Sequence, residues 1–214
     1  MIDKNPEKIK KMFDLISSKY DFMNDIISFK MHKLAKYIAL KDLELKNYNQ
    51  VLDLCCGSGD LAILAKKIYP KIEIIGVDFS EKMINIAKKR DKNLSFLVGD
   101  AKDLQFKDNQ FDCVMMGFGL RNIDDTSKAL KEVYRVLKSD GKFLHLDFNS
   151  KAFLNKFYDV FIKLILFFLK NKEAYLYLIQ SKNEFKLPDD LDGFKLIKKK
   201  TIFFDMISYQ IFAK

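Results

Sequence analysis

The sequence predicts an α/β fold in which a mostly parallel sheet ends in an antiparallel hairpin. From residue 51 onward, apolar segments of strand length alternate with amphipathic segments of helical length. Such alternation is typical of parallel strands joined by helices that cover both faces of one sheet. Two β-rich segments lie close together at the end of the chain and favour a hairpin. Five parallel strands and this hairpin give a seven-stranded sheet.

Glycines join the first strand to the first helix of this core. Val51–Leu54 is predicted to be a buried strand, and Asp60–Tyr69 an amphipathic helix that stops at Pro70. Gly57 and Gly59, in the turn between them, can take positive φ and let a ligand approach the backbone closely. A strand that turns through glycines into a helix leaves backbone N–H groups and a positive helix end facing an open site. We therefore expect a ligand at this turn.

The following segments repeat the alternation. Ile72–Val77 is predicted to be the second strand. Ser80 is a suitable N-cap for a helix that runs to Arg90. Leu94–Val98 and Phe111–Met116 are then predicted to be the third and fourth strands.

The last elements of the core lead into the hairpin. Asp125–Leu137 is predicted to be a helix that ends in a turn where Gly141 takes the left-handed conformation. Lys142–Phe148 is predicted to be the fifth strand, and Phe194–Phe204 with Met206–Ala213 the antiparallel hairpin. The first 50 residues and the segment 150–190 are expected to be helical additions outside this core.

The composition suits one globular domain. A chain of 214 residues, 49% hydrophobic and 31% charged, is neither disordered nor an integral membrane protein. No segment resembles a secretory leader, and the three cysteines form no disulfide framework, so we expect a cytoplasmic protein. The net charge of +9 reflects either a general bias towards lysine or an anionic partner. Because no nucleic-acid-reading motif is present, we expect an acidic lipid surface rather than DNA or RNA.

Acidic residues stand at the ends of three predicted strands. Asp53 lies just inside the first strand, and Asp78 and Asp100 follow the second and third. Parallel strands bind ligands at their carboxyl ends, and Asp78 follows the glycine turn at the distance where an acid meets a ribose. Taken alone, Asp78 could cap a helix and Asp100 could form a turn. The sequence Gly57–Ala62 also fits the pattern G-x-G-x-x-A, so an NAD-dependent oxidoreductase is an alternative.

These residues together resemble a known enzyme class. The turn and the strand-end acids resemble the Rossmann-like class I S-adenosylmethionine-dependent methyltransferases at Asp53–Asp60, Asp78, Gly99–Ala101 and Lys138–Gly141. Segments outside that core look like the ubiquinone/menaquinone biosynthesis C-methyltransferases at Lys19–Asn24, Ser28, His32, Val77–Met83, Phe118–Asn122 and Tyr175–Ser181. The chain departs from that family at Asp147, where the family usually has Glu.

The resemblance implies a cofactor, S-adenosylmethionine, and no metal. It implies that the cofactor is bound by Asp53, Gly57, Ser58, Gly59, Asp78, Asp100, Ala101 and Gly117. The residues implied in catalysis are Arg121, Asn122 and Tyr20. The residues implied in substrate binding are Asp21, Asn24, His32 and Tyr175. An arginine such as Arg121 can stabilise a phenolate or orient a water molecule, but its own pKa makes it a poor base.

The resemblance also implies a reaction and its partners. The enzyme is expected to methylate a ring carbon of a prenylated quinol, with demethylmenaquinol the first choice and a methoxy-polyprenyl benzoquinol the second. We expect residues 1–50 to form a lid, 51–149 the cofactor-binding core, 150–190 a substrate-side insertion and 191–214 the hairpin. The Phe-rich segment 153–169 is a candidate for contact with the prenyl tail. Peripheral binding to the inner face of the cytoplasmic membrane is expected, and a second copy of the chain is a further candidate partner.

Overall fold

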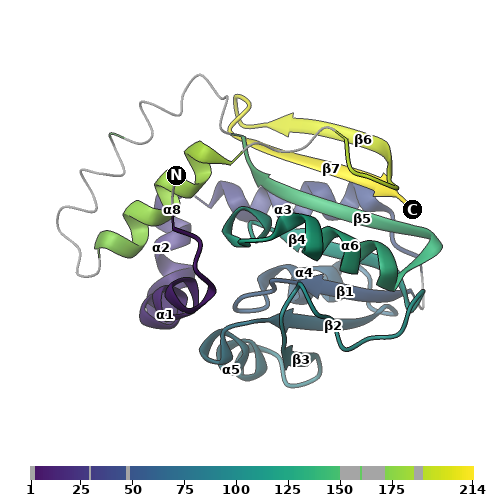
Figure 1. Cartoon of the computed structure of the whole chain (residues 1–214), viewed down its shortest axis with the longest axis horizontal. Coiled ribbons are helices and arrows are strands. Elements are labelled where there is room, and N and C mark those ends of the chain that lie inside the picture. Colours follow the sequence, from purple (N-terminus) through teal and green to yellow (C-terminus); the bar gives the residue numbers. More distant parts are fainter. Residues whose placement is uncertain (1–2, 29, 47–48, 150–159, 161–171, 186–189) are drawn as a thin grey trace.

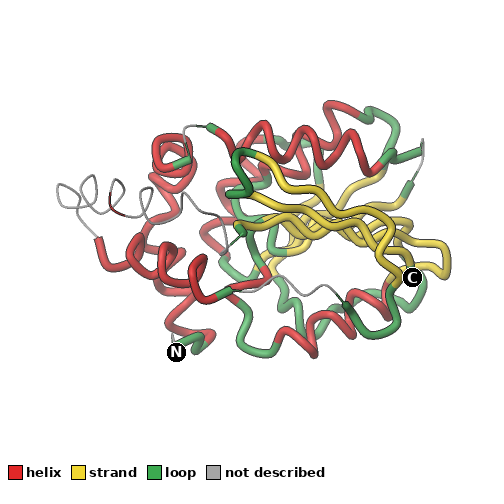
Figure 2. Tube along the Cα trace, turned by 90° about the horizontal axis from the view of Figure 1, so that it is seen from above, coloured by secondary structure: helices red, strands yellow, loops and turns green. Residues whose placement is uncertain are grey.

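One twisted sheet organises the chain, and helices cover both of its faces (Figure 2). The computed structural model describes residues 3–28, 30–46, 49–149, 160, 172–185 and 190–214. The strands are β1 (Gln50–Leu54), β2 (Glu73–Asp78), β3 (Ser95–Val98), β4 (Phe111–Gly117), β5 (Leu137–Phe148), β6 (Lys195–Ile202) and β7 (Ile207–Ala213). Their order across the sheet is β3-β2-β1-β4-β5-β7-β6, so the predicted seven-stranded architecture is confirmed.

The order of the strands places a ligand-binding edge beside β1. β1 pairs in parallel with β2 on one side and with β4 on the other, and Leu52 faces Ile75 and Val114 across the two ladders. After β1, the chain first adds β2 and β3 on one side of that strand and then adds β4 to β7 on its other side, so the order of the strands reverses at β1. In open α/β sheets this reversal leaves a crevice at the carboxyl ends of the central strands. The last two strands form the predicted antiparallel hairpin, in which β7 pairs with both β5 and β6.

The helices differ in their relation to the sheet. The described helical segments are α1 (Pro6–Ile16), η1 (Ser17–Lys19), α2 (Tyr20–Ile27), α3 (Met31–Leu43), α4 (Asp60–Ile68), α5 (Glu81–Arg90), η2 (Leu120–Asn122), α6 (Thr126–Val136) and α8 (Lys172–Glu184). α1, α2 and α8 lie together beside one end of the sheet (Figure 1). There Ile16 and Met23 share a small buried cluster with Tyr175. The Phe-rich segment 153–169, apart from residue 160, lies outside the described residues.

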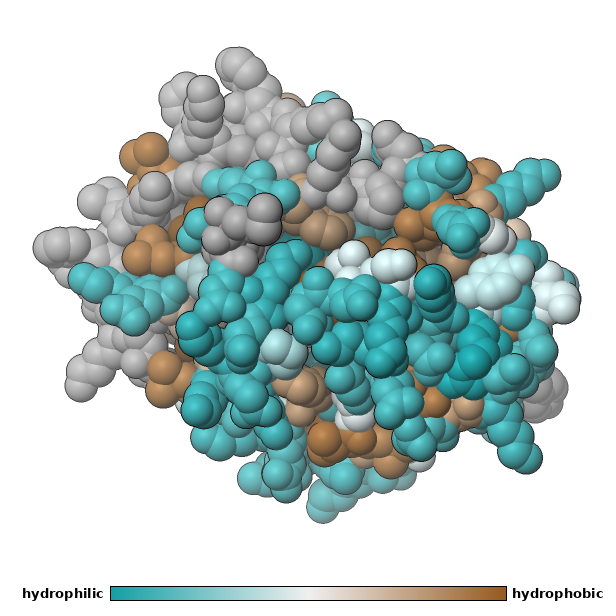
Figure 3. All heavy atoms as spheres, viewed as in Figure 1, coloured by the Kyte–Doolittle hydropathy of each residue, from teal (hydrophilic) through white to brown (hydrophobic). Residues whose placement is uncertain are grey.

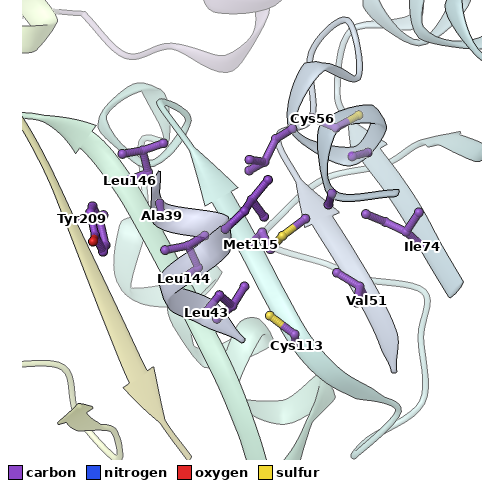
Figure 4. Packing of buried hydrophobic residues seen from close by; sticks show 14 of the residues in the cluster. Ala39, Leu43, Val51, Cys56, Ile74, Cys113, Met115, Leu144, Leu146 and Tyr209 are labelled. Atoms are coloured by element: carbon purple, nitrogen blue, oxygen red, sulfur yellow. The ribbon is translucent and has the colours of Figure 1, made fainter. Parts of the chain in front are cut away.

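The core lies on both faces of the sheet. Residues of α3, α4 and α5 pack on one face with Leu144 and Tyr209, and α6 packs on the other with Phe143 and Phe111. Figure 4 shows Ala39 and Leu43 of the first cluster close to the strands that they cover. α3 thus belongs to the packed layer, although it lies within the first 50 residues. The front face, where α6 lies, is mainly hydrophilic (Figure 3), and no described helix is long and apolar enough to cross a bilayer.

One predicted boundary is wrong. Gly141 does not take positive φ, and no left-handed turn separates α6 from the fifth strand. The chain becomes extended immediately after α6, at Leu137, because that residue already pairs with Phe111 of β4. β5 is therefore five residues longer at its start than the predicted strand, which began at Lys142. The other strand boundaries agree with the predictions to within one residue, apart from the hairpin, where the first strand ends two residues earlier than predicted.

Candidate active site

The loop after β1 contains three residues in the left-handed backbone conformation, which glycine adopts readily. Cys55, Gly57 and Gly59 all have positive φ, at 59°, 55° and 83°. A Cβ atom on Gly59 would approach the Phe96 ring to 2.8 Å, whereas a Cβ atom on Gly57 would meet nothing within 4 Å. Gly59 is therefore required by packing, and Gly57 presents open backbone. The loop ends at the first turn of α4, whose unpaired N–H groups favour negative charge nearby.

Asp78 ties this loop to the end of β2. Its Oδ2 accepts a hydrogen bond of 2.8 Å from the N–H of Gly57, and its Oδ1 accepts one of 2.9 Å from the N–H of Ser80. Burial raises the pKa of the Asp78 carboxyl above its ordinary value. Each carboxylate oxygen can accept a second hydrogen bond. The same side chain that orders the loop can thus bind two neighbouring hydroxyl groups of a ribose.

A first cavity opens at the carboxyl ends of β1, β2 and β4. The cofactor residues expected from the sequence that line it are Gly57, Asp78, Asp100, Ala101 and Gly117. Ile9 and Phe13 of α1 cover it from the N-terminal side, and Asn122 also lines it. The cavity combines carboxylates, backbone groups and apolar side chains, a mixture that suits a nucleoside with a polar tail.

Three of the expected cofactor residues lie elsewhere. Asp53 is buried and lines neither this cavity nor the next, and its Oδ2 accepts a hydrogen bond of 2.9 Å from the N–H of Ala62. Gly59 also lines neither cavity and serves as the N-cap residue of α4. Ser58 lines the second cavity, and its hydroxyl donates to Asp21 over 2.6 Å. These three residues shape the loop that the first cavity borders.

A second cavity adjoins the first. The catalytic and substrate residues expected from the sequence that line it are Tyr20, Asn24, His32, Arg121 and Tyr175. The residues that line both cavities are Tyr20, Cys55, Gly57, Gly117 and Phe118. Two ligands, one in each cavity, would therefore meet at this shared wall. Burial raises the pKa of the Tyr20 hydroxyl and of the Cys55 thiol, so both keep their protons at neutral pH.

Arg121 is buried and makes several contacts with its surroundings. Only 4% of its side chain is exposed, and its Nη1 donates to Oδ1 of Asp147 over 2.5 Å and to the carbonyl of Phe118 over 2.9 Å. Its Nε lies 3.4 Å from Oγ of Ser181 in α8. The guanidinium also lies over the rings of Phe118 and Phe148. The ion pair with the fully buried Asp147 therefore holds the Arg121 guanidinium in place at the wall of the second cavity.

The N-terminal helices are fastened to the loops of the core by contacts that the sequence did not indicate. Asp21 of α2 receives hydrogen bonds from Ser58 and from Nη1 of Arg90, the latter over 2.9 Å. Asp14 of α1 receives one of 2.5 Å from the hydroxyl of Ser80. Asp21 itself lines neither cavity. Its position supports a role in holding α2 over the site rather than in contacting a substrate.

The comparisons with known proteins identify relatives along the whole chain. The model of the ubiE/COQ5 methyltransferase family matches residues 1–214. The demethylmenaquinone methyltransferase of Staphylococcus carnosus (strain TM300) is 40% identical over 212 residues, which cover 91% of this chain and 88% of the relative. The corresponding protein of Staphylococcus aureus (strain JH9) is 38% identical, with 87% and 82% covered.

Solved structures share the fold. A methyltransferase from Thermotoga maritima superposes with a TM-score of 0.62 at 24% identity, covering 95% of this chain and 99% of that one. A methyltransferase from Aquifex aeolicus gives a TM-score of 0.60 at 20% identity, covering 98% of each chain. At these identities the two structures establish the architecture alone.

Proposed function

The chain belongs to the ubiE/COQ5 methyltransferase family, and from this premise we propose that it methylates a ring carbon of demethylmenaquinol. It is an S-adenosylmethionine-dependent methyltransferase, so the alternative of an NAD-dependent oxidoreductase is dropped. The relatives at 38–40% identity carry the name demethylmenaquinone methyltransferase, which favours that substrate over a methoxy-polyprenyl benzoquinol.

The two adjoining cavities carry the proposal. S-adenosylmethionine, when bound, supplies an electrophilic methyl carbon on a sulfonium. The first cavity suits it, since Asp78 offers free lone pairs for ribose hydroxyls while Asp100 and Ala101 line the part proposed for the adenine. The second cavity then receives the quinol ring, and the shared wall at Gly117 and Cys55 brings the ring carbon to the methyl group.

The second cavity supplies groups that suit a phenolic ring. We assign to Arg121 the stabilisation of negative charge on the phenolic oxygen, because a buried cation acts strongly in a site that excludes water. Tyr20 lies where the two cavities meet and can orient the ring. Asn122 lines the first cavity, and its buried Oδ1 has no hydrogen-bond partner among the described residues, so it can accept one from the cofactor.

The substrate is tested by the quinones that cells contain. Deleting the gene should make demethylmenaquinone accumulate, and returning the wild-type gene should restore the methylated quinone. Accumulation of a demethylated methoxybenzoquinone instead would assign the enzyme to the second substrate. Unchanged quinones would contradict both.

The role of Asp78 gives a separate prediction. Asp78→Asn should weaken S-adenosylhomocysteine binding by about 1.5–3 kcal/mol, because a charged acceptor for two hydroxyl groups is replaced by a neutral one. Asp53→Asn is the matched control, since Asp53 lines neither cavity and should leave the affinity near that of the wild type. Calorimetry measures both affinities. Equal losses in the two variants would mean that the loop, and not Asp78 itself, determines the affinity.

We also propose that the protein binds anionic membranes peripherally, which a prenylated substrate requires. β6 is an exposed edge strand with four lysines, and Phe204 in the turn after it is 82% exposed. This turn precedes Ile207, which pairs with Phe148 at the wall of the second cavity. A cationic strand and an exposed aromatic ring near the substrate cavity suit an acidic lipid surface.

Vesicle co-sedimentation tests this surface. The wild type should bind anionic vesicles at low salt and release them at high salt, and Phe204→Ser should weaken the binding several-fold. Leu97→Ser is the control, because Leu97 is also exposed but lies in β3 at the opposite edge of the sheet. Equal binding to neutral and anionic vesicles would contradict the proposal.

A further inference from the structure

The methylation of a ring C–H group releases one proton, and the roles assigned above name no acceptor for it. The guanidinium of Arg121 is already protonated and paired with Asp147, so it cannot take up another proton. We propose that His32, acting through the hydroxyl of Ser28, accepts the ring proton. The inference rests on the proposed function, because it concerns the same second cavity.

The junction between α2 and α3 brings the two side chains together at the cavity wall. Ser28 follows α2 and His32 lies in the first turn of α3, with the sharp bend made by the positive φ of Lys30. Oγ of Ser28 lies 2.5 Å from Nδ1 of His32, and both side chains are buried and line the second cavity. The hydroxyl and the imidazole are thus joined directly at the cavity wall.

The far side of the imidazole faces two carboxylates. Nε2 of His32 lies 3.5 Å from Oδ1 of Asp25 and 4.0 Å from Oδ2 of Asp60. Both Nε2 and Oδ1 of Asp25 are buried without a hydrogen-bond partner among the described residues. A proton on Nε2 suits this environment, and the lone pair of Nδ1 is then left for the Ser28 hydroxyl. The single proton of the Ser28 hydroxyl has two acceptors within reach, the carbonyl of Asn24 at 2.6 Å and Nδ1 of His32 at 2.5 Å, and the transfer uses the rotamer in which it donates to Nδ1.

The surrounding charges keep the imidazole neutral until it receives the proton. Burial and the nearby ammonium group of Lys36, with a smaller effect from Lys33, lower the pKa of His32 to about 4, against the opposing effect of Asp60 and Asp25. A weak base is sufficient, since loss of the ring proton restores aromaticity. The same two carboxylates then stabilise the imidazolium.

The transfer takes place in two steps. The ring carbon forms a bond to the methyl carbon while the bond between methyl and sulfur breaks, with its electron pair going to sulfur. The C–H bond at the methylated carbon then breaks, and its electron pair restores the aromatic ring and returns negative charge to the phenolic oxygen. The proton goes to Oγ of Ser28 as the hydroxyl proton moves to Nδ1 of His32. Asp25, which is partly exposed, offers the route from the imidazolium to solvent.

Other candidate acceptors are less suitable. His145, the second of the two histidines in the chain, is buried and lines neither cavity. Cys55 lines both cavities, but burial raises the pKa of its thiol, so the thiolate form is absent at neutral pH. Among the described residues that line the second cavity, His32 is the only imidazole.

Nuclear magnetic resonance tests the resting state of His32 without any reaction. Protein labelled with ¹⁵N-histidine gives signals from two residues only, and His145→Gln assigns them. We expect His32 to be neutral at pH 7 with its proton on Nε2, and Ser28→Ala to shift the Nδ1 signal. A His32 that is cationic at pH 7, or that carries its proton on Nδ1, would overturn the proposal.

Isotope effects test the transfer itself. With a short-tailed demethylmenaquinol deuterated at the carbon that is methylated, the wild type should show no large isotope effect. His32→Gln and Ser28→Ala should lower single-turnover rates by about 100-fold or more and introduce a primary isotope effect, because proton removal then limits the rate. Imidazole in the buffer should partly restore the activity of His32→Ala.

Control measurements separate this role from a structural one. Ser17→Ala removes a hydroxyl that donates to the carbonyl of Asp14 and lines neither cavity, so it should leave the rate unchanged. S-adenosylhomocysteine affinity should stay near the wild-type value in the His32 and Ser28 variants. Slower variants that show no isotope effect and no rescue by imidazole would mean that His32 only packs the cavity wall. Failure of the wild type to methylate the quinol would instead contradict the proposed function, while the resonance test still stands.

Discussion

Replacing Arg121 by leucine is expected to cut turnover by at least about 100-fold and to lower the free energy of unfolding by about 3–5 kcal/mol. The loss of turnover follows from removing the cation that we assign to the phenolic oxygen. The loss of stability follows from Asp147, which is fully buried and would keep a carboxyl group without its partner. Turnover with demethylmenaquinol and denaturant unfolding measure the two effects.

A double variant separates these effects. Arg121→Leu with Asp147→Leu removes both charges and should recover most of the lost stability, because an apolar pair of similar volume replaces a buried ion pair without leaving a charge behind. Turnover should stay at the level of the single variant. Recovery of turnover in the double variant would show that the single substitution acts through misfolding and that Arg121 has no part in the reaction.

The parts of the fold that the sequence predicted are those that local patterns determine. The strand before the turn, the glycines and the helix after Asp60 are adjacent in the chain, so apolar periodicity and backbone freedom were enough to predict them. The N-cap role of Ser80 is confirmed for the same reason, since its hydroxyl accepts from the N–H of Met83. The start of β5 and the turn at Gly141 were mispredicted because pairing of Leu137 with the distant Phe111 outweighed the turn preference of the local sequence.

The candidate site could be predicted in part only. Most of the expected residues line one of the two cavities, because strand ends in a parallel sheet meet at one edge. The partners of these residues come from distant segments: Arg90 is 69 residues from Asp21, and Asp147 is 26 residues from Arg121. Such pairs are selected by how the helices pack over the sheet, and no local pattern in a single sequence records them.

The acidic residue inside β1 is expected to make stability depend on pH. Asp53 was interpreted from the sequence as a cofactor ligand, yet it is buried and lines neither cavity, and only the N–H of Ala62 donates to it among the described residues. Burial raises the pKa of its carboxyl from 3.8 to about 7. A carboxyl with a raised pKa in the folded state binds a proton that the unfolded chain releases, so its contribution to stability is greatest at low pH.

Asp53→Asn should therefore become more stable relative to the wild type as the pH rises from about 4 to 7, by several kcal/mol in all, with no further change above that range. The amide oxygen can still accept the hydrogen bond from Ala62, while the cost of a buried charge is removed. Because every other titrating group is shared, the difference between the two proteins in urea unfolding isolates Asp53. Asp53→Leu should show the same pH dependence but lie about 1–3 kcal/mol lower, since the N–H of Ala62 loses its acceptor. A difference between wild type and Asp53→Asn that stays constant across this range would mean that Asp53 titrates alike in the folded and unfolded chains.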